Sequence, residues 1–267
     1  MTEEQTSLGW LSSILDILLK ECPWDSVQTI ETLRYLTIEE VYELSEAITA
    51  AKPDEISKEL GDLFMHLMFY CKLAEKKGLF SSSDAIDGIC KKLIARHPHI
   101  ALPDRKGIIH NPQAATTPKW EEVKMREGRK SALEGVPDSM PSLVKAIRIQ
   151  EKAAGMGFEF PNAEMAKAKV DEEYGELLEA LDGMTQNGND SSKRHAEEEL
   201  GDLLFAIVKW AHLNGLNADD ALSRTNMKFK ERFSYIEQEA HKDGLAVNQL
   251  TLDEMTTLWN RAKEPLT

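Results

Sequence analysis

The chain carries one set of short sequence patterns twice, in the same order. The sequence Glu-Leu-Gly-Asp-Leu, for example, begins at Glu59 and begins again at Glu199. The matched segments are 39–43, 59–64, 92–96 and 120–124 in the first half and 172–176, 199–204, 228–232 and 259–263 in the second. Four matched segments in one order indicate a duplicated module, so the chain must build the same small architecture twice.

Apolar residues in both halves recur at three- and four-residue spacing, which is typical of amphipathic helices, whereas alternating strand-like runs are hard to find. The expected helices cover residues 33–51, 54–77, 84–96, 142–154, 163–184, 192–214, 218–240 and 251–263. A stretch rich in Gly and Asn at 183–190 is predicted to be an exposed turn. We therefore predict an all-α fold of duplicated helical-bundle modules.

Prolines mark the joint between the two modules. Six of the ten prolines lie between residues 98 and 141, where only a short helical pattern at 118–129 interrupts them. The sequence predicts an N-terminal module at 1–100, a proline-rich linker with a short helix at 101–141, and a C-terminal module at 142–267.

Composition excludes several classes of protein. The net charge is −14, whereas proteins that bind nucleic acid or anionic membranes normally present a basic face. The three cysteines are an odd number without Cys-x-x-Cys spacing, and the longest apolar run is far shorter than a membrane-spanning helix. The expectation is a cytoplasmic protein that binds neither nucleic acid nor membrane.

Paired acids are the main candidates for chemistry. Positions three apart lie about 60° apart around a helix, so Glu40 and Glu43 share one face, and Glu59 and Asp62 share a face of the next helix. Antiparallel packing would bring these four carboxylates together, and Glu173, Glu176, Glu199 and Asp202 repeat the arrangement. One such pair alone is more often a solvated helix face. Their duplication favours a site for a hard divalent cation, Mg²⁺ or Mn²⁺, which resolves the repulsion.

Basic residues follow each acidic set. Lys92 and Arg96 in the first half, and Lys228 and Arg232 in the second, are four apart and so share a helix face. Beside a carboxylate and metal site, such pairs suit a polyphosphate ligand, although alone they would be ordinary surface charge. Trp120 and Trp259 could stack on a base or could anchor the terminal helices.

The acidic motifs resemble those of the MazG family of nucleoside triphosphate pyrophosphohydrolases. The family motif, Glu-Glu-x-x-Glu followed after a spacer by Glu-x-x-Asp, occurs twice, and the flanking segments 22–25, 96–99 and 139–143 resemble the two-domain bacterial members. The resemblance implies a helical bundle that completes its site by homodimerisation. It also implies Mg²⁺-dependent hydrolysis of (d)NTPs between the α and β phosphates, which gives the monophosphate and diphosphate.

The resemblance also assigns roles residue by residue. Implied metal ligands are Glu173, Glu176, Glu199 and Asp202 in the second half and Glu40, Glu43, Glu59 and Asp62 in the first. Glu172 and Glu39 are implied as neighbouring carboxylates that hold water or act as base. Lys228 and Arg232 would hold phosphates with help from Lys169, and Trp259 would contact the base or ribose.

The two halves are not equal. Alignment of the acidic motifs sets Leu36 opposite Lys169, so the first half lacks one basic residue. We therefore expect the main catalytic site in the C-terminal module and a weaker or structural metal site in the N-terminal one. The segment 157–160 reads Gly-Phe-Glu-Phe where better-known relatives carry Gly-Phe-Asp-Trp, a change that affects a loop more than the chemistry.

Two other functions compete with this interpretation. A di-iron carboxylate bundle normally needs Glu-x-x-His on two helices, but Asp62 and Asp202 stand at those positions. A nucleotide-sensing or scaffold dimer that binds NTP without turnover is the non-enzymatic alternative. A P-loop NTPase is not supported, because no Gly-x-x-x-x-Gly-Lys-Ser/Thr sequence occurs.

Overall fold

The chain consists of two helical units in a computed structural model that describes residues 6–109, 112, 123, 128 and 130–263. The units span residues 1–118 and 119–267. Within the described ranges no residue lies in a β-strand, and the one extended pairing is an isolated bridge between Pro103 and Ile109. The predicted all-α fold is confirmed. The linker helix expected at 118–129, with Trp120, lies outside the described residues apart from Val123 and Gly128.

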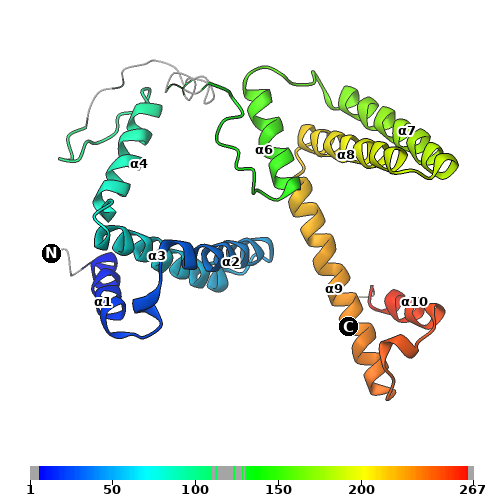
Figure 1. Ribbon diagram of the computed structural model, residues 1–267, viewed down its shortest axis with the longest axis horizontal. Helices are drawn as coiled ribbons and strands as arrows, with labels where there is room; N and C mark the ends of the chain where they lie inside the picture. Colours follow the sequence, from blue (N-terminus) through cyan, green and yellow to red (C-terminus); the bar gives the residue numbers. More distant parts are fainter. Residues whose placement is uncertain (1–5, 110–111, 113–122, 124–127, 129, 264–267) are drawn as a thin grey trace. The chain divides into compact units, whose positions relative to one another are not determined.

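The first unit is built around a helical hairpin (Figure 1). Its helices are α1 (Ser7–Glu21), the short 3₁₀ turn η2 (Asp25–Val27), α2 (Ile30–Thr49), α3 (Pro53–Lys76) and α4 (Ser82–Arg96). Thr29 caps the start of α2 through a capping box, and Pro53 occupies the first position of α3. Only three residues join α2 to α3, so the two helices pack along each other as an antiparallel pair.

The core of the first unit lies between α1, α2 and α3. Leu15 and Leu33 are 1% and 2% exposed, and they pack with Phe69 and Leu73. Helix α1 was not among the expected helices, yet it supplies Leu15 to this core. Because α1 closes one side of the α2–α3 hairpin, it holds that hairpin in place.

Leu33→Ala is expected to destabilise the first unit by about 2–5 kcal/mol, because truncation leaves a cavity that the core cannot fill. Chemical unfolding followed by circular dichroism measures this effect. The matched control, Leu79→Ala, truncates a leucine that is 63% exposed and should change stability by about 0.5 kcal/mol or less. Equal effects of the two substitutions would contradict the packing described here.

The second unit repeats the hairpin, and its first helix, α7, is longer than α2. It contains α6 (Ser142–Gly155), α7 (Ala163–Asn187), α8 (Asp190–Leu213), α9 (Ala218–Lys242), η3 (Val247–Gln249) and α10 (Leu252–Arg261). Helices α7 and α8 pack along each other, α6 contacts α8 and α9, and α10 packs on α9 (Figure 1).

The turn between α7 and α8 is shorter than predicted. Helix α7 continues through Gly183 to Asn187, so the predicted turn at 183–190 is wrong over most of its length. Gly188 takes φ 58° and ends the helix, and the Asn189 side chain caps α8 at once. One glycine inside a helix costs about 1 kcal/mol, and packing of α7 against α8 outweighs that cost.

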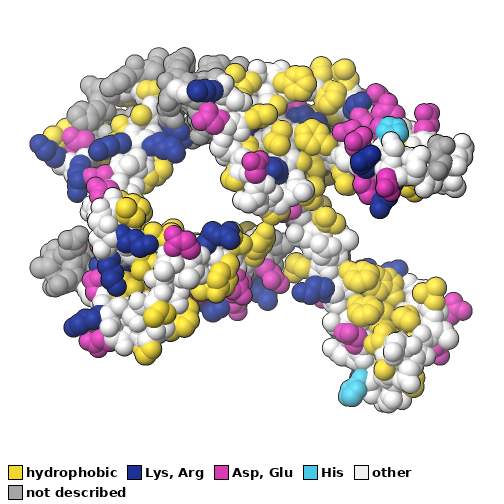
Figure 2. Space-filling model, viewed as in Figure 1, with side chains coloured by type: hydrophobic (Ala, Val, Ile, Leu, Met, Phe, Trp, Pro, Cys, Tyr) yellow, Lys and Arg dark blue, Asp and Glu magenta, His cyan; other side chains and the backbone are white. Residues whose placement is uncertain are grey.

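Many large apolar side chains remain on the surface of both units. In the space-filling view, yellow side chains cover much of the visible face over α2 and α3 and over α6 and α8 (Figure 2). Exposed examples on the two hairpins are Val41, Tyr42, Phe64, Leu67, Tyr174, Leu178, Leu200 and Leu204. An exposed apolar surface of this extent is typical of interaction sites. In the described part of the chain, no helix has the length and apolar character needed to cross a membrane.

Candidate active site

Three carboxylates of the second unit meet where α7 and α8 pack together. Glu173, Glu199 and Asp202 each offer an oxygen, and these oxygens lie within 4.8 Å of one another. Glu173 is only 6% exposed, Glu199 is partly buried and Asp202 is exposed. The i, i+3 spacing of Glu199 and Asp202 puts both on the α8 face that packs against α7. The structure therefore brings together three of the four carboxylates that the motif implied.

Glu176 lies beside this cluster. Desolvation by neighbouring protein atoms, followed by the charge of Glu173, raises the pKa of the exposed Glu176 carboxyl, and Glu199 contributes in the same direction. Crowded carboxylates repel one another, and a positive charge between them relieves this repulsion. The charges of the other acids thus affect Glu176, although Glu176 is not one of the three residues whose oxygens lie within 4.8 Å of one another.

Lys169 supplies a positive charge from the same face of α7. Its Nζ donates to Glu172 Oε1 at 2.8 Å and lies 2.6 Å from Glu173 Oε1. These contacts, with Glu172 first, raise the pKa of Lys169 above its usual value. The lysine stays charged and holds Oε1 of the buried Glu173.

His195 was not identified from the sequence. Its Nδ1 lies 3.4 Å from Glu199 Oε1, one helical turn away on α8. The i, i+4 spacing could have indicated this pair, but the first half has Glu55 at the corresponding place, so the repeat gave no signal.

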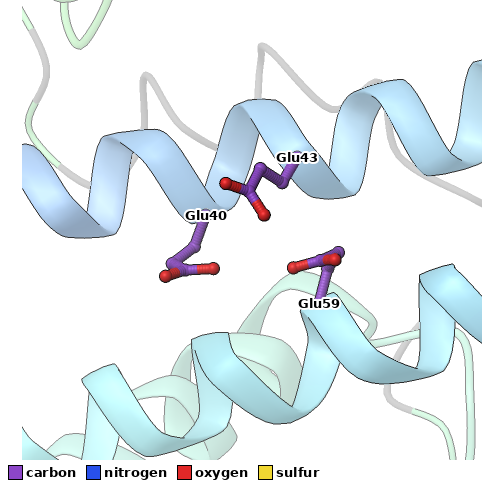
Figure 3. Close-up of side chains that lie close together, drawn as sticks. All are labelled: Glu40, Glu43 and Glu59. Atoms are coloured by element: carbon purple, nitrogen blue, oxygen red, sulfur yellow. The ribbon is translucent and has the colours of Figure 1, made fainter.

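The first unit holds a second carboxylate cluster. Glu40 and Glu43 on α2 and Glu59 on α3 offer oxygens within 4.8 Å of one another, and Figure 3 shows the three side chains pointing together from two helices. Burial, followed by the charges of Asp62 and Glu43, raises the pKa of Glu40. Asp62 is therefore an electrostatic neighbour of the cluster without being one of its three members.

Glu59 is the most buried acid of this cluster, with 4% of its surface exposed. Lys58 donates to its Oε1 at 3.0 Å, whereas its Oε2 has no hydrogen-bond partner among the described residues. A buried carboxylate oxygen without a partner is costly unless a cation binds it. The cluster, made only of carboxylate oxygens, has the donor chemistry of a hard cation site.

The basic residues form a separate cluster on α9 and α10. The guanidinium of Arg232 lies 5.4 Å from the centre of the Trp259 ring, and the ring of Phe229 lies 5.0 Å from that of Trp259. Lys228 is exposed one turn before Arg232. The guanidinium thus has aromatic support, and the structure brings Arg232 and Trp259 together, a contact that the sequence did not predict. In the first unit, the corresponding Arg96 is buried at the end of α4.

Both repeats of the chain resemble known proteins. The model of the MazG nucleotide pyrophosphohydrolase domain matches residues 28–101 and 162–236, and each range contains three of the four repeated segments of its half. The chain is 36% identical to the Thermotoga maritima nucleoside triphosphate pyrophosphohydrolase/pyrophosphatase MazG, over 91% of this chain and 89% of that protein. It is 35% identical to an Escherichia coli nucleoside triphosphate pyrophosphohydrolase, over 91% of this chain and 90% of that one.

The chain belongs to the MazG family. The resemblance found in the acidic repeat is confirmed, and the duplicated all-α fold is that of two MazG domains. A Mycobacterium tuberculosis nucleoside triphosphate pyrophosphohydrolase, by contrast, is 32% identical over only 54% of the chain. MazG-type hydrolases are generally metal-dependent, and each MazG domain of this chain contains one acidic cluster.

A pocket of about 650 Å³ adjoins the acidic cluster of the second MazG domain. Lys169, Glu173 and Asp202 are part of its wall, and the rest of the wall comes from Leu133, from α6 and α8, and from the segment 157–160. Three polar residues in this wall were not identified from the sequence: Gln150, Glu159 and Lys209. Gln150 and Lys209 lie 59 positions apart and belong to none of the motifs, and Glu159 stands out in the sequence only as a departure from relatives in the segment 157–160, so only the fold shows that the three line one pocket.

Proposed function

We propose that the chain is a Mg²⁺-dependent nucleoside triphosphate pyrophosphohydrolase that converts (d)NTP and water to (d)NMP and diphosphate. We place the main site in the C-terminal module. The observation that carries the proposal is the meeting of Glu173, Glu199 and Asp202 within 4.8 Å, beside Lys169. Glu173, Glu176, Glu199 and Asp202 would hold Mg²⁺, for which Mn²⁺ is a possible substitute. A bound divalent cation lowers the pKa of water and neutralises phosphate charge.

Other residues of the chain would provide proton transfer and substrate binding. Glu172, which accepts a hydrogen bond from Lys169, would accept the proton of the attacking water as general base. Lys228 and Arg232 would bind the phosphates and stabilise the charge that builds on the leaving diphosphate. Trp259, which supports Arg232, would contact the base or ribose. No covalent intermediate with the protein is required.

The N-terminal cluster is proposed to be a weaker or structural metal site. Glu40, Glu43, Glu59 and Asp62 are its proposed ligands, and the unpartnered Oε2 of Glu59 supports this assignment. The half lacks a counterpart of Lys169, since Leu36 stands at that position. Lys58 instead pairs with Glu59 from the neighbouring position. A metal can bind here, but fewer cationic groups are available for a triphosphate.

Homodimerisation is part of the proposal. The exposed apolar residues on α7 and α8, including Leu178, Leu200 and Leu204, need a covering layer, and a second copy of the chain supplies the same surface. Neither Arg232 nor Trp259 lines the pocket beside the acidic cluster. A dimer could bring the basic cluster of one protomer to the acidic cluster of its partner. The modules are proposed to span residues 1–100 and 142–267, joined by 101–141.

The net charge of −14 supports a cytoplasmic enzyme that binds neither nucleic acid nor membrane. Since the substrate is itself a polyanion, binding has to depend on Mg²⁺ and on local groups such as Lys169, Lys228 and Arg232.

The direct test is a panel of NTPs and dNTPs assayed for monophosphate and diphosphate. We expect equimolar release of both with Mg²⁺ and none with EDTA. Release of inorganic phosphate in place of diphosphate would refute the proposed bond cleavage. Nucleotide binding without turnover would support a sensing or scaffold dimer, and bound iron in the purified protein would favour a di-iron bundle.

Metal binding should also stabilise the protein. At a Mg²⁺ concentration of 100 times Kd, one site adds about 2.7 kcal/mol to the free energy of unfolding. We expect a rise in the melting temperature on adding Mg²⁺ and its reversal by EDTA, measured by scanning calorimetry. The same concentration of K⁺ is the control, since a monovalent ion cannot balance several carboxylates. Equal shifts with the two ions would contradict a specific divalent site.

A further inference from the structure

The pocket beside the C-terminal acidic cluster combines an apolar wall with a few buried polar groups. The apolar part consists of Ile149 and Ala153 from α6, Phe160 from the loop that precedes α7, and Phe205 and Ala206 from α8. Pockets of this kind bind small ligands through apolar and aromatic contacts and orient them through a few polar groups. The wall is continuous with Glu173 and Asp202, so one ligand can reach both the pocket and the carboxylates.

Gln150 is the first of the polar groups. Its side chain is only 5% exposed, and its Nε2 donates to the backbone carbonyl of Phe205 at 2.7 Å. That hydrogen bond fixes the orientation of the amide, because only the nitrogen can donate. The remaining oxygen, Oε1, is buried and has no hydrogen-bond partner within the described part of the chain. A buried acceptor without a partner is costly, which points to a donor that arrives with a ligand.

Lys209 and Glu159 provide the second polar feature. Lys209 is 6% exposed and forms an ion pair with Glu159 across the pocket wall. Such a pair presents a donor and an acceptor next to each other. The edge of a nucleobase carries the same two kinds of group side by side.

We propose that this pocket holds the nucleobase of the substrate and that Gln150 Oε1 accepts a hydrogen bond from the base edge. The inference rests on the proposed function, because the triphosphate end of the ligand must lie at the carboxylates. The flat base then packs among the apolar side chains, and Lys209 with Glu159 reads its edge. Of the two contacts proposed for Trp259, base or ribose, only the ribose contact then remains.

The position of these residues in the chain makes them selectivity determinants. Gln150, Ala153 and Glu159 all precede residue 162, where the second MazG domain match begins, whereas the acidic cluster lies inside it. The residues proposed to bind metal and phosphate thus lie in the matched domain, whereas about half of the residues that line the base pocket lie in the segment before it. The pocket can therefore differ between relatives that share the same chemistry.

The test fills the pocket without changing the acidic cluster. Ala153→Leu is compared with Ala154→Leu, which alters the next residue of the same helix, also partly buried, at a position that does not line the pocket. Ala153→Leu should raise KM for ATP and CTP by at least about tenfold, because the added side chain occupies space that the base needs. Ala154→Leu should leave KM unchanged. The competitive inhibition constant of inorganic tripolyphosphate, which has no base, should be equal in all three proteins.

A second variant tests the acceptor. Gln150→Leu removes Oε1 with little change in volume and should change the order of preference among ATP, GTP, CTP and UTP. An unchanged order, or a KM that Ala153→Leu does not move, overturns the base pocket while leaving the hydrolase proposal intact. Binding of AMP, measured by calorimetry without turnover, keeps the two proposals separate. If the wild-type protein binds AMP but hydrolyses no NTP, and Ala153→Leu abolishes AMP binding, the base pocket is supported and the hydrolase proposal is refuted.

Discussion

Replacing Glu173 and Glu176 together by alanine is expected to lower kcat/KM for nucleoside triphosphates by about a thousandfold or more. Glu173 is the most buried acid of its cluster, and its loss removes a proposed metal ligand. The substitution also removes the Glu173 partner of Lys169 at 2.6 Å, so the remaining lysine no longer holds the site in its present geometry. Diphosphate release under saturating Mg²⁺ measures the effect.

Two matched pairs show whether the effect belongs to this cluster. Glu179 and Asp182 have the same spacing on the same helix but are exposed and outside the cluster, so their double alanine variant should keep full activity. Glu40→Ala with Glu43→Ala removes the corresponding pair of the first unit and should leave most of the activity. Loss of activity in this variant, with activity retained in Glu173→Ala and Glu176→Ala, would reverse the assignment of the two modules.

The sequence was informative where a property depends on local spacing. The i, i+3 pairs of acids require only a helix to share a face, and the duplicated hairpin follows from apolar spacing and short connections. The convergence of Glu173 with Glu199 and Asp202 could therefore be expected before the structure. Their role as metal ligands stays a prediction.

Features that depend on distant parts of the chain could not be predicted. Gln150 and Phe205 are hydrogen-bonded across 55 positions, and Lys209 meets Glu159 across 50. None of these four residues is part of the repeat, and only Glu159 lies in a segment, 157–160, that resembles one in relatives. The length of α7 shows a different limit, because Gly183 and the polar residues after it favour a turn locally while packing against α8 keeps them helical.

Apolar periodicity has a further limit, which bears on assembly. It identifies an apolar helix face but does not tell whether that face packs inside the protomer or against another protein. Leu178, Leu200 and Leu204 follow the helical pattern, yet all three are exposed in the second unit. The dimer proposed above gives these residues a partner surface, and its consequence for catalysis is measurable.

Mixing two inactive variants is expected to restore activity if each site is shared between protomers. The first variant carries Glu173→Ala and Glu176→Ala, and the second carries Lys228→Ala and Arg232→Ala. The second variant alone should lose about a hundredfold or more in kcat/KM, because each charged hydrogen bond to phosphate is worth about 1.5–3 kcal/mol. When the two are unfolded together and refolded in equal amounts, half of the dimers contain one copy of each.

In such a mixed dimer, one site combines both sets of substitutions and the other combines the intact acids of one protomer with the intact basic pair of its partner. The mixture should therefore regain about a quarter of the wild-type activity. If acids and basic residues of the same protomer form each site, every site in the mixture carries a substitution and no activity returns. Refolding each variant alone is the control, and sedimentation confirms that the mixture contains dimers. Recovery in the mixture alone would show that Arg232 and Lys228 act on the substrate held by the partner's carboxylates.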